Sequence, residues 1–156
     1  MEETITEVTL YSDGSSRGNP GPGGYGTILR YVDSSGEVFE REYSEGFPET
    51  TNNRMEIMGV IAGLEKLIRP CRVNIISDSQ YVVNAFNKGW IENWQRNDWK
   101  GSDKKPVKNV DLWQRLLKAA GGHELHFTWV RGHNGQEENE RCDRLATAAA
   151  DKAGAG

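Results

Sequence analysis

The sequence predicts an α/β fold in which a mixed sheet of five strands is covered by helices. Near the N-terminus, short segments that alternate apolar and polar residues are separated by turn residues, which is typical of an antiparallel meander. Over residues 53–68 the apolar period lengthens to about 3.6, which indicates a helix. Further along, two short apolar strands alternate with helical segments, a pattern that favours parallel pairing. The expected order of elements is βββαβαααβα.

Each element has its own local signal. The first strand ends at Asp13-Gly14, a turn dipeptide, and residues 19–24 are a turn-rich linker of Gly and Pro. Pro70 closes the first helix, because proline cannot continue one. The expected strands cover residues 6–12, 25–32, 37–43, 73–76 and 125–130. The expected helices cover residues 53–68, a segment through Tyr81 to Ala85, 90–96, 111–120 and 138–153.

The length and composition predict one domain over residues 1–156, large enough to bury a core without staples. No apolar run approaches the roughly 18 residues of a membrane span. The acidic start Met1-Glu2-Glu3 has no secretory n-region, so we expect a cytoplasmic protein. Cys71 and Cys142 have no CxxC spacing, and we expect reduced, packed thiols.

The charge is distributed unevenly along the chain. A net charge of −4 is unusual for a nucleic-acid-binding protein, which is normally basic. The stretch from Phe86 to Lys118, however, holds eight basic and four acidic residues, so it carries +4 while the remainder carries −8. Such asymmetry indicates a surface that faces a polyanion.

Four carboxylates stand at the predicted ends of strands and helices. Taken singly, each has a structural alternative. Asp13 before Gly14 suits a turn, and Glu56 has the spacing of a capping interaction with Asn53. Asp78 suits the N-cap of the next helix, and Asp143 could be a solvated surface acid.

Taken together, the four acids favour a metal site. Asp13 and Asp78 leave their strands at the carboxyl end, where open α/β sheets bind ligands, and lie side by side if those strands are neighbours. Glu56 and Asp143 can reach the same crevice. Four ionised carboxylates there would repel one another, and two divalent cations such as Mg²⁺ would neutralise them. Two ions about 3.5–4 Å apart can clamp both oxygens of a phosphodiester that is being cleaved.

Five motifs follow one another along the chain: YSDGSSRGNPGPGGYG at 11–26, TTNNRMEIMGVIAGLE at 50–65, SDSQYV at 77–82, WVRGHNG at 129–135 and ENERCDRLA at 138–146. In these motifs the chain resembles bacterial ribonuclease HI, the type 1 RNase H family, from about Thr6 to Asp151. The resemblance implies an RNase H-like mixed five-stranded sheet and endonucleolytic cleavage of the RNA strand of an RNA–DNA hybrid. It also implies Mg²⁺, with Mn²⁺ as a substitute, held by Asp13, Glu56, Asp78 and Asp143.

The resemblance assigns further residues. His133, on a loop between glycines, corresponds to the family's mobile-loop histidine and can carry a proton. Residues that match the family's hybrid-contacting positions are Asn19, Thr51, Asn52 and Gln80. For Thr51 and Asn52 the alternative is plain helix capping. The segment 88–108 resembles the family's basic protrusion, with Lys100, Lys104, Lys105 and Lys108 facing phosphates. Glu92, Asp98 and Asp103 dilute its charge, and Trp90 and Trp94 are better explained as core packing.

The sequence thus predicts a monomeric, Mg²⁺-dependent ribonuclease H that leaves 5′-phosphate and 3′-hydroxyl ends. Two alternatives remain. A DNA-processing nuclease could use the same fold, since a fold does not determine a function. A non-catalytic hybrid-binding module is opposed by the intact acid set, because four carboxylates beside a polyanion are unfavourable unless metals are bound.

Overall fold

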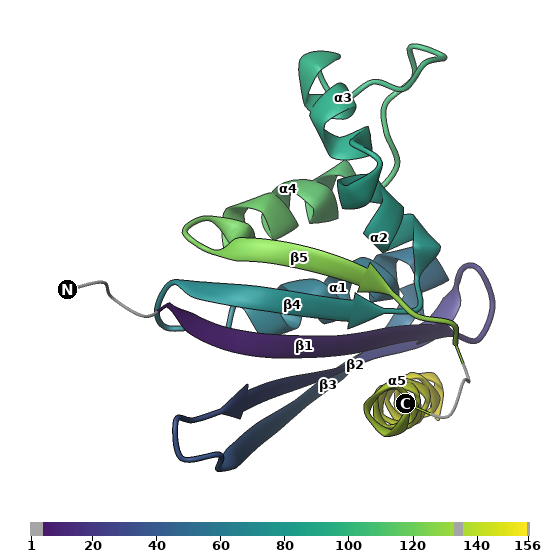
Figure 1. Cartoon of the computed structure of the whole chain (residues 1–156). Coiled ribbons are helices and arrows are strands. Elements are labelled where there is room, and N and C mark those ends of the chain that lie inside the picture. The colour runs from purple at the N-terminus through teal and green to yellow at the C-terminus, as the bar shows by residue number, and fades with distance from the viewer. Residues whose placement is uncertain (1–4, 133–135, 156) are drawn as a thin grey trace.

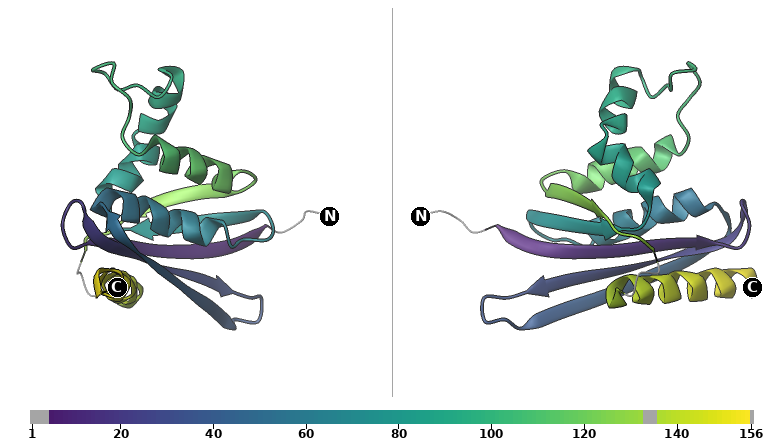
Figure 2. Two further views of the ribbon diagram at one scale, coloured as in Figure 1. Left: turned by 180° about the vertical axis from the view of Figure 1, so that it is seen from behind. Right: turned by 45° about the vertical axis from the view of Figure 1, so that its right-hand side comes forward.

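The computed structural model describes residues 5–132 and 136–155. It contains one five-stranded mixed sheet with helices on both faces (Figures 1 and 2), and the strand order is β3-β2-β1-β4-β5. The strands are β1 Thr6–Ser16, β2 Gly21–Val32, β3 Val38–Thr50, β4 Cys71–Ser77 and β5 Glu124–Trp129. The helices are α1 Asn52–Leu64, α2 Gln80–Asn87, α3 Trp90–Arg96, α4 Val110–Ala120 and α5 Glu137–Ala155. The predicted fold class and element order are confirmed.

Strand β1 is the axis of the sheet. It pairs antiparallel with β2 on one side and parallel with β4 on the other, and β4 pairs parallel with β5. The parallel register between β1 and β4 ends with Ser12 opposite Ser77. The first and fourth strands are therefore neighbours, which is the condition for Asp13 and Asp78 to lie side by side.

The main core lies between the sheet and helices α1, α2 and α4. From Met55 to Leu64 every residue of α1 is buried, and Trp113 of α4 is fully enclosed. On the opposite face, α5 lies across β1, β2 and β3 (Figure 2), with Cys142 packed beside Tyr11 and Ile28. Both cysteines are free and buried, as expected. Within the described ranges, no helix combines the length and apolar character that crossing a membrane requires.

Several element boundaries differ from the prediction, and three of them are instructive. The Gly-Pro segment is not a linker up to Gly24, because β2 begins at Gly21 and pairs with β1 as far as Ser16. Helix α1 ends at Leu64 rather than at residue 68, and Ile68 is 90% exposed. Strand β3 extends to Thr50 because it remains paired with the lengthened β2. In each case strand pairing or exposure outweighed the local signal.

Residues 88–109, which we call the protrusion, project away from the sheet and include α3 (Figure 1). Trp94 packs on Trp113 with ring centroids 5.8 Å apart, and Trp90 lies 6.3 Å from Trp94. These rings pack against the main core, which confirms that Trp90 and Trp94 are packing residues. The protrusion is thus attached to the domain through aromatic contacts at its base.

Candidate active site

Strand register brings Asp13 and Asp78 together. Each follows a member of the paired residues Ser12 and Ser77, at the edge where β4 ends. Asp13 still lies within β1, because that strand continues beside β2 after β4 has stopped. The turn explanation for Asp13 is therefore wrong. The N-cap explanation for Asp78 is also wrong, since Ser79 caps α2 by accepting from the Val82 N–H.

Glu56 reaches the same edge from α1. The N-cap of α1 is Thr51, whose hydroxyl accepts from the Arg54 N–H at 3.3 Å, so Glu56 is not part of a capping box with Asn53. Glu56 is only 6% exposed. The helix can approach β1 closely because residue 14 is glycine: a Cβ there would lie 2.6 Å from the Glu56 nitrogen. A larger residue at position 14 would push α1 away from Asp13.

Asp143 approaches from the other face of the sheet. Cys142, next to Asp143, anchors this part of α5 in the small core beside Tyr11. Tyr11 precedes Asp13 by two residues in β1. The Asp143 carboxylate lies near enough to raise the pKa of Asp13. Asp143 is half-buried and not a fully solvated surface acid. We call Asp13, Glu56, Asp78 and Asp143 the carboxylate cluster.

Burial and the repulsion between neighbouring carboxylates dominate the electrostatics of Asp13 and Glu56. Burial is the largest cause that raises the pKa of Asp13 from 3.8 to about 8, and the charge of Asp78 adds to it. A hydrogen bond from the Gly14 N–H to Asp13 Oδ1, at 2.9 Å, acts in the opposite direction. Burial, followed by the charge of Asp13, likewise raises the pKa of Glu56 well above its ordinary value.

The donor set fits a hard divalent cation. One carboxylate oxygen each from Asp13, Glu56 and Asp78 lie within 4.8 Å of one another. Glu56 Oε2 is buried and has no hydrogen-bond partner among the described residues. An unsatisfied buried carboxylate oxygen is costly, and a cation would satisfy it. All-oxygen ligands are those that Mg²⁺ and Mn²⁺ select.

The end of β5 and the residues after it contact Asp78 and its neighbour Ser77. The Trp129 indole N–H donates to the Asp78 carbonyl oxygen at 3.0 Å, and the Val130 N–H donates to the Ser77 carbonyl at 3.0 Å. Gly132 lies so close that a Cβ would meet Asp78 Oδ2 at 2.7 Å. The sequence marks this segment as a family motif and as the setting of His133, but it does not indicate the contacts with Asp78. His133 itself lies outside the described residues.

The four residues expected to contact a hybrid lie at the ends of elements around the cluster. Asn19 precedes β2 and accepts from the Asn52 N–H at 3.0 Å, which holds these two residues together at the start of α1. Gln80 is the first residue of α2 and is exposed, as are Asn19 and Asn52. Thr51 caps α1, so the capping alternative holds for it, although its side chain is also half-exposed.

Residues 100–108 form the lysine loop, and its four lysines are exposed. No ion pair among the described residues involves them. The loop is shaped by a bridge between Lys100 and Pro106 and by a bond from the Gly101 N–H to the Lys105 carbonyl, at 2.9 Å. Its charges are therefore available to a polyanion.

Comparison with known proteins identifies the family. The chain matches the RNase H family over residues 5–151. It is 60% identical over 146 residues to a ribonuclease H of Lachnoclostridium phytofermentans, covering 93% of this chain and 92% of that protein. It superposes on the crystal structure of LC9-RNase H1, a type 1 RNase H, with a TM-score of 0.87 and 32% identity, over 97% of this chain and 75% of that one. It also superposes on LC11-RNase H1 in complex with an RNA/DNA hybrid, with a TM-score of 0.62 and 26% identity, over 94% of this chain and 98% of that one. The chain belongs to the ribonuclease H family.

Proposed function

We propose that this protein is an endonuclease that uses divalent cations, with Mg²⁺ as the expected ion, to hydrolyse the RNA strand of RNA–DNA hybrids. The observation that carries the proposal is the convergence of three carboxylate oxygens, from Asp13, Glu56 and Asp78, within 4.8 Å. Glu56 Oε2 is in addition buried with no hydrogen-bond partner among the described residues. That convergence occurs in a chain of the ribonuclease H family. A relative on the same fold binds an RNA/DNA hybrid, which supports the substrate.

In this proposal the carboxylate cluster holds two ions, with Asp13, Glu56, Asp78 and Asp143 as ligands. When bound, the ions supply an activated water and stabilise charge on the phosphodiester. The protein side chains hold their geometry because β1, α1 and α5 are packed around them. His133 carries a proton to or from the reacting groups. The products are a 5′-phosphate and a 3′-hydroxyl.

Recognition of the hybrid divides between two kinds of contact. Asn19, Thr51, Asn52 and Gln80 present short amides and a hydroxyl, which suit minor-groove edges and 2′-hydroxyl groups and carry no sequence information. The lysine loop supplies phosphate contacts, which position a duplex without specifying its sequence. This combination favours a hybrid over a DNA duplex, which has no 2′-hydroxyl groups.

The test compares cleavage of an RNA–DNA hybrid, duplex DNA and duplex RNA of one sequence, with Mg²⁺ and with EDTA. We expect cleavage of the RNA strand of the hybrid only, and none with EDTA. Cleavage of duplex DNA at a comparable rate would make the protein a DNA-processing nuclease. Hybrid binding with no cleavage under any divalent cation would make it a binding module.

A further inference from the structure

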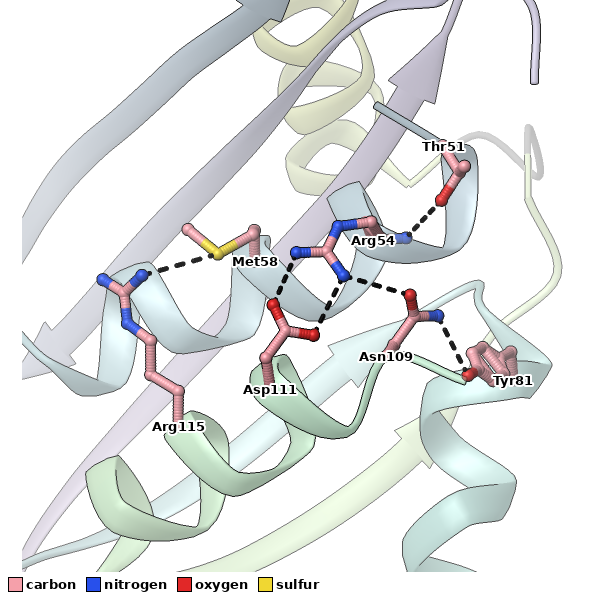
Figure 3. A network of polar contacts seen from close by, with 7 residues as sticks. All are labelled: Thr51, Arg54, Met58, Tyr81, Asn109, Asp111 and Arg115. Carbon is pink, nitrogen blue, oxygen red and sulfur yellow. Dashed lines mark hydrogen bonds and ion pairs between the residues drawn. The ribbon is translucent and has the colours of Figure 1, made fainter. Parts of the chain in front are cut away.

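One network of side chains connects α1 to the start of α4 and to α2 (Figure 3). Arg54 on α1 donates to both carboxylate oxygens of Asp111 on α4, at 3.0 Å from Nη1 and 2.7 Å from Nη2. The same Nη1 donates to Asn109 Oδ1 at 3.2 Å. Asn109 Nδ2 in turn donates to the Tyr81 hydroxyl on α2, at 3.3 Å. Both polar atoms of the Asn109 amide are engaged, which fixes the orientation of that side chain.

The network lies where the protrusion returns to the domain. Asn109 is the last residue of the protrusion and directly follows Lys108. Its backbone is left-handed, with φ of 64°, and makes the sharp turn into α4 without a side-chain cap. At the other end of the network, Arg54 lies in the first turn of α1, two residues before Glu56. One guanidinium therefore joins the return of the lysine loop to the start of the helix that carries Glu56.

We propose that Arg54 is a positioning residue that holds the protrusion, and with it the lysine loop, at a fixed orientation to the carboxylate cluster. This inference rests on the proposed function. The planar guanidinium can donate two parallel hydrogen bonds to a carboxylate and a further one to an amide oxygen. A lysine ammonium is a point charge and cannot hold both partners in this fixed geometry. Asp111 neutralises the charge of Arg54, so the pair offers no net attraction to phosphates. What Arg54 contributes is geometry.

The molecule contains a matched control. Arg115 of α4 forms a second two-bond pair with Glu65, just past the end of α1, with Nε to Oε2 at 2.9 Å and Nη2 to Oε1 at 2.8 Å. This pair joins the same two helices about three turns further along α1, away from the protrusion. The Arg115 and Arg54 side chains are 48% and 34% exposed. If Arg54 only held α1 against α4, loss of either arginine would have the same effect.

The experiment compares Arg54→Met, Asp111→Ala and Arg115→Met with the parent protein in steady-state cleavage of one hybrid, well below the melting temperature of every variant. Arg54→Met and Asp111→Ala should each raise KM by about 3- to 10-fold, the equivalent of up to one phosphate contact near 0.1 M salt. Their kcat should stay within about twofold, because the carboxylate cluster is intact. Arg115→Met should leave both constants near those of the parent.

The sign for Asp111→Ala separates geometry from charge. This variant removes a negative charge and leaves Arg54 uncompensated, so a purely electrostatic role for Arg54 predicts a lower KM. A positioning role predicts a higher KM for both variants. A KM that falls in Asp111→Ala, or that rises equally in Arg54→Met and Arg115→Met, would overturn the inference.

Amide hydrogen exchange of the free proteins gives a readout that does not depend on cleavage. Residues 97–109 should exchange faster in Arg54→Met and Asp111→Ala than in the parent and in Arg115→Met, because local opening reports the loss of local restraints. Unchanged exchange there would also overturn the inference. A parent protein that cleaves no hybrid would contradict the proposed function instead, and the exchange data would still decide whether Arg54 holds the protrusion.

Discussion

The carboxylate cluster and the lysine loop belong to one chain but are positioned in different ways. Asp13 and Glu56 are 9% and 6% exposed, and strand register and helix packing determine where they lie. The lysines are exposed, and turn hydrogen bonds and a few contacts at the base of the protrusion hold their loop. Burial raises the pKa values of Asp13 and Glu56 but gives these acids a fixed geometry. Exposure leaves the lysines free to meet phosphates but makes their position depend on Arg54 and the tryptophans.

Substitutions in the carboxylate cluster and in the lysine loop should therefore affect different steps of the reaction. Damage to the carboxylate cluster should affect the chemical step, because metal ligands act on the reacting phosphate. Damage to the lysine loop should affect affinity and its salt dependence, because phosphate contacts act through counterion release.

The largest effect is expected for Asp13→Asn, which removes a ligand charge and keeps the shape of the side chain. Several kcal/mol of stabilisation of the reacting phosphate should be lost, so kcat should fall by at least about 10³-fold. The fold and hybrid affinity should be retained within a few-fold. Cleavage rates and direct binding measure the two quantities. Activity within a few-fold of the parent would remove Asp13 from the metal site.

A smaller effect on the chemical step is expected for His133→Ala. General acid–base contributions are worth about 10²–10⁴-fold, and the carboxylate cluster would remain intact. Turnover should slow, while metal-dependent cleavage specific to the hybrid stays detectable. The check is kcat from pH 6 to 9 for both proteins. If the variant and the parent have the same rate throughout this range, His133 takes no part in proton transfer.

The lysine loop should fail through binding. Four lysines are replaced by Ala in this variant: Lys100, Lys104, Lys105 and Lys108. The slope of log affinity against log salt should become shallower by about 1–3, since each lost phosphate contact reduces the slope by about 0.7–0.9. KM should rise for every hybrid sequence alike, and kcat should change little. Steady-state cleavage at several salt concentrations measures both. An unchanged KM and slope would mean that Asn19, Thr51, Asn52 and Gln80 hold the substrate without the loop.

The smallest effect concerns the stability of the metal-free protein. The folded state keeps the Asp13 proton up to a pKa of about 8, whereas the unfolded chain loses it near 3.8. Between these values the unfolded state binds fewer protons, so the free energy of unfolding should fall as pH rises. Asp13→Asn removes this cost and should be more stable than the parent by about 1–3 kcal/mol near pH 9, with little difference near pH 4. Urea denaturation in EDTA across this range is the test. If the free energy of unfolding had the same pH dependence in both proteins, Asp13 would not be the acid whose pKa is raised in the folded state.

Much of the carboxylate cluster could be predicted because its signals are local. Asp13 and Asp78 each follow a segment that the sequence marks as a strand, and the pairing of β1 with β4 brings the two carboxylates together. What failed was the detail. Asp13 lies inside β1 because pairing with β2 carries the strand past the predicted turn. The Gly-Pro segment has the composition of a turn, yet strand pairing determines its conformation from Gly21 onward.

The protrusion was predictable in charge but not in shape. Asp98, Trp99 and Lys104 adopt left-handed backbone conformations, which non-glycine residues seldom do and which nothing in their local sequence indicates. The network of Arg54 with Asn109 and Asp111 joins residues more than 50 positions apart, and hydrophobic periodicity carries no information on such pairs. Only the approach of α4 to α1 in the folded chain reveals it.

The most direct test of the division between chemistry and binding is the single-turnover cleavage rate of one hybrid as a function of enzyme concentration. It should be measured for the parent, Asp13→Asn and the quadruple lysine variant. The lysine variant should reach the plateau rate of the parent, but at higher concentration. Asp13→Asn should bind the hybrid and show no plateau above background. If both variants lost the plateau, or both only shifted the concentration needed to reach it, the carboxylate cluster and the lysine loop would not have separate roles.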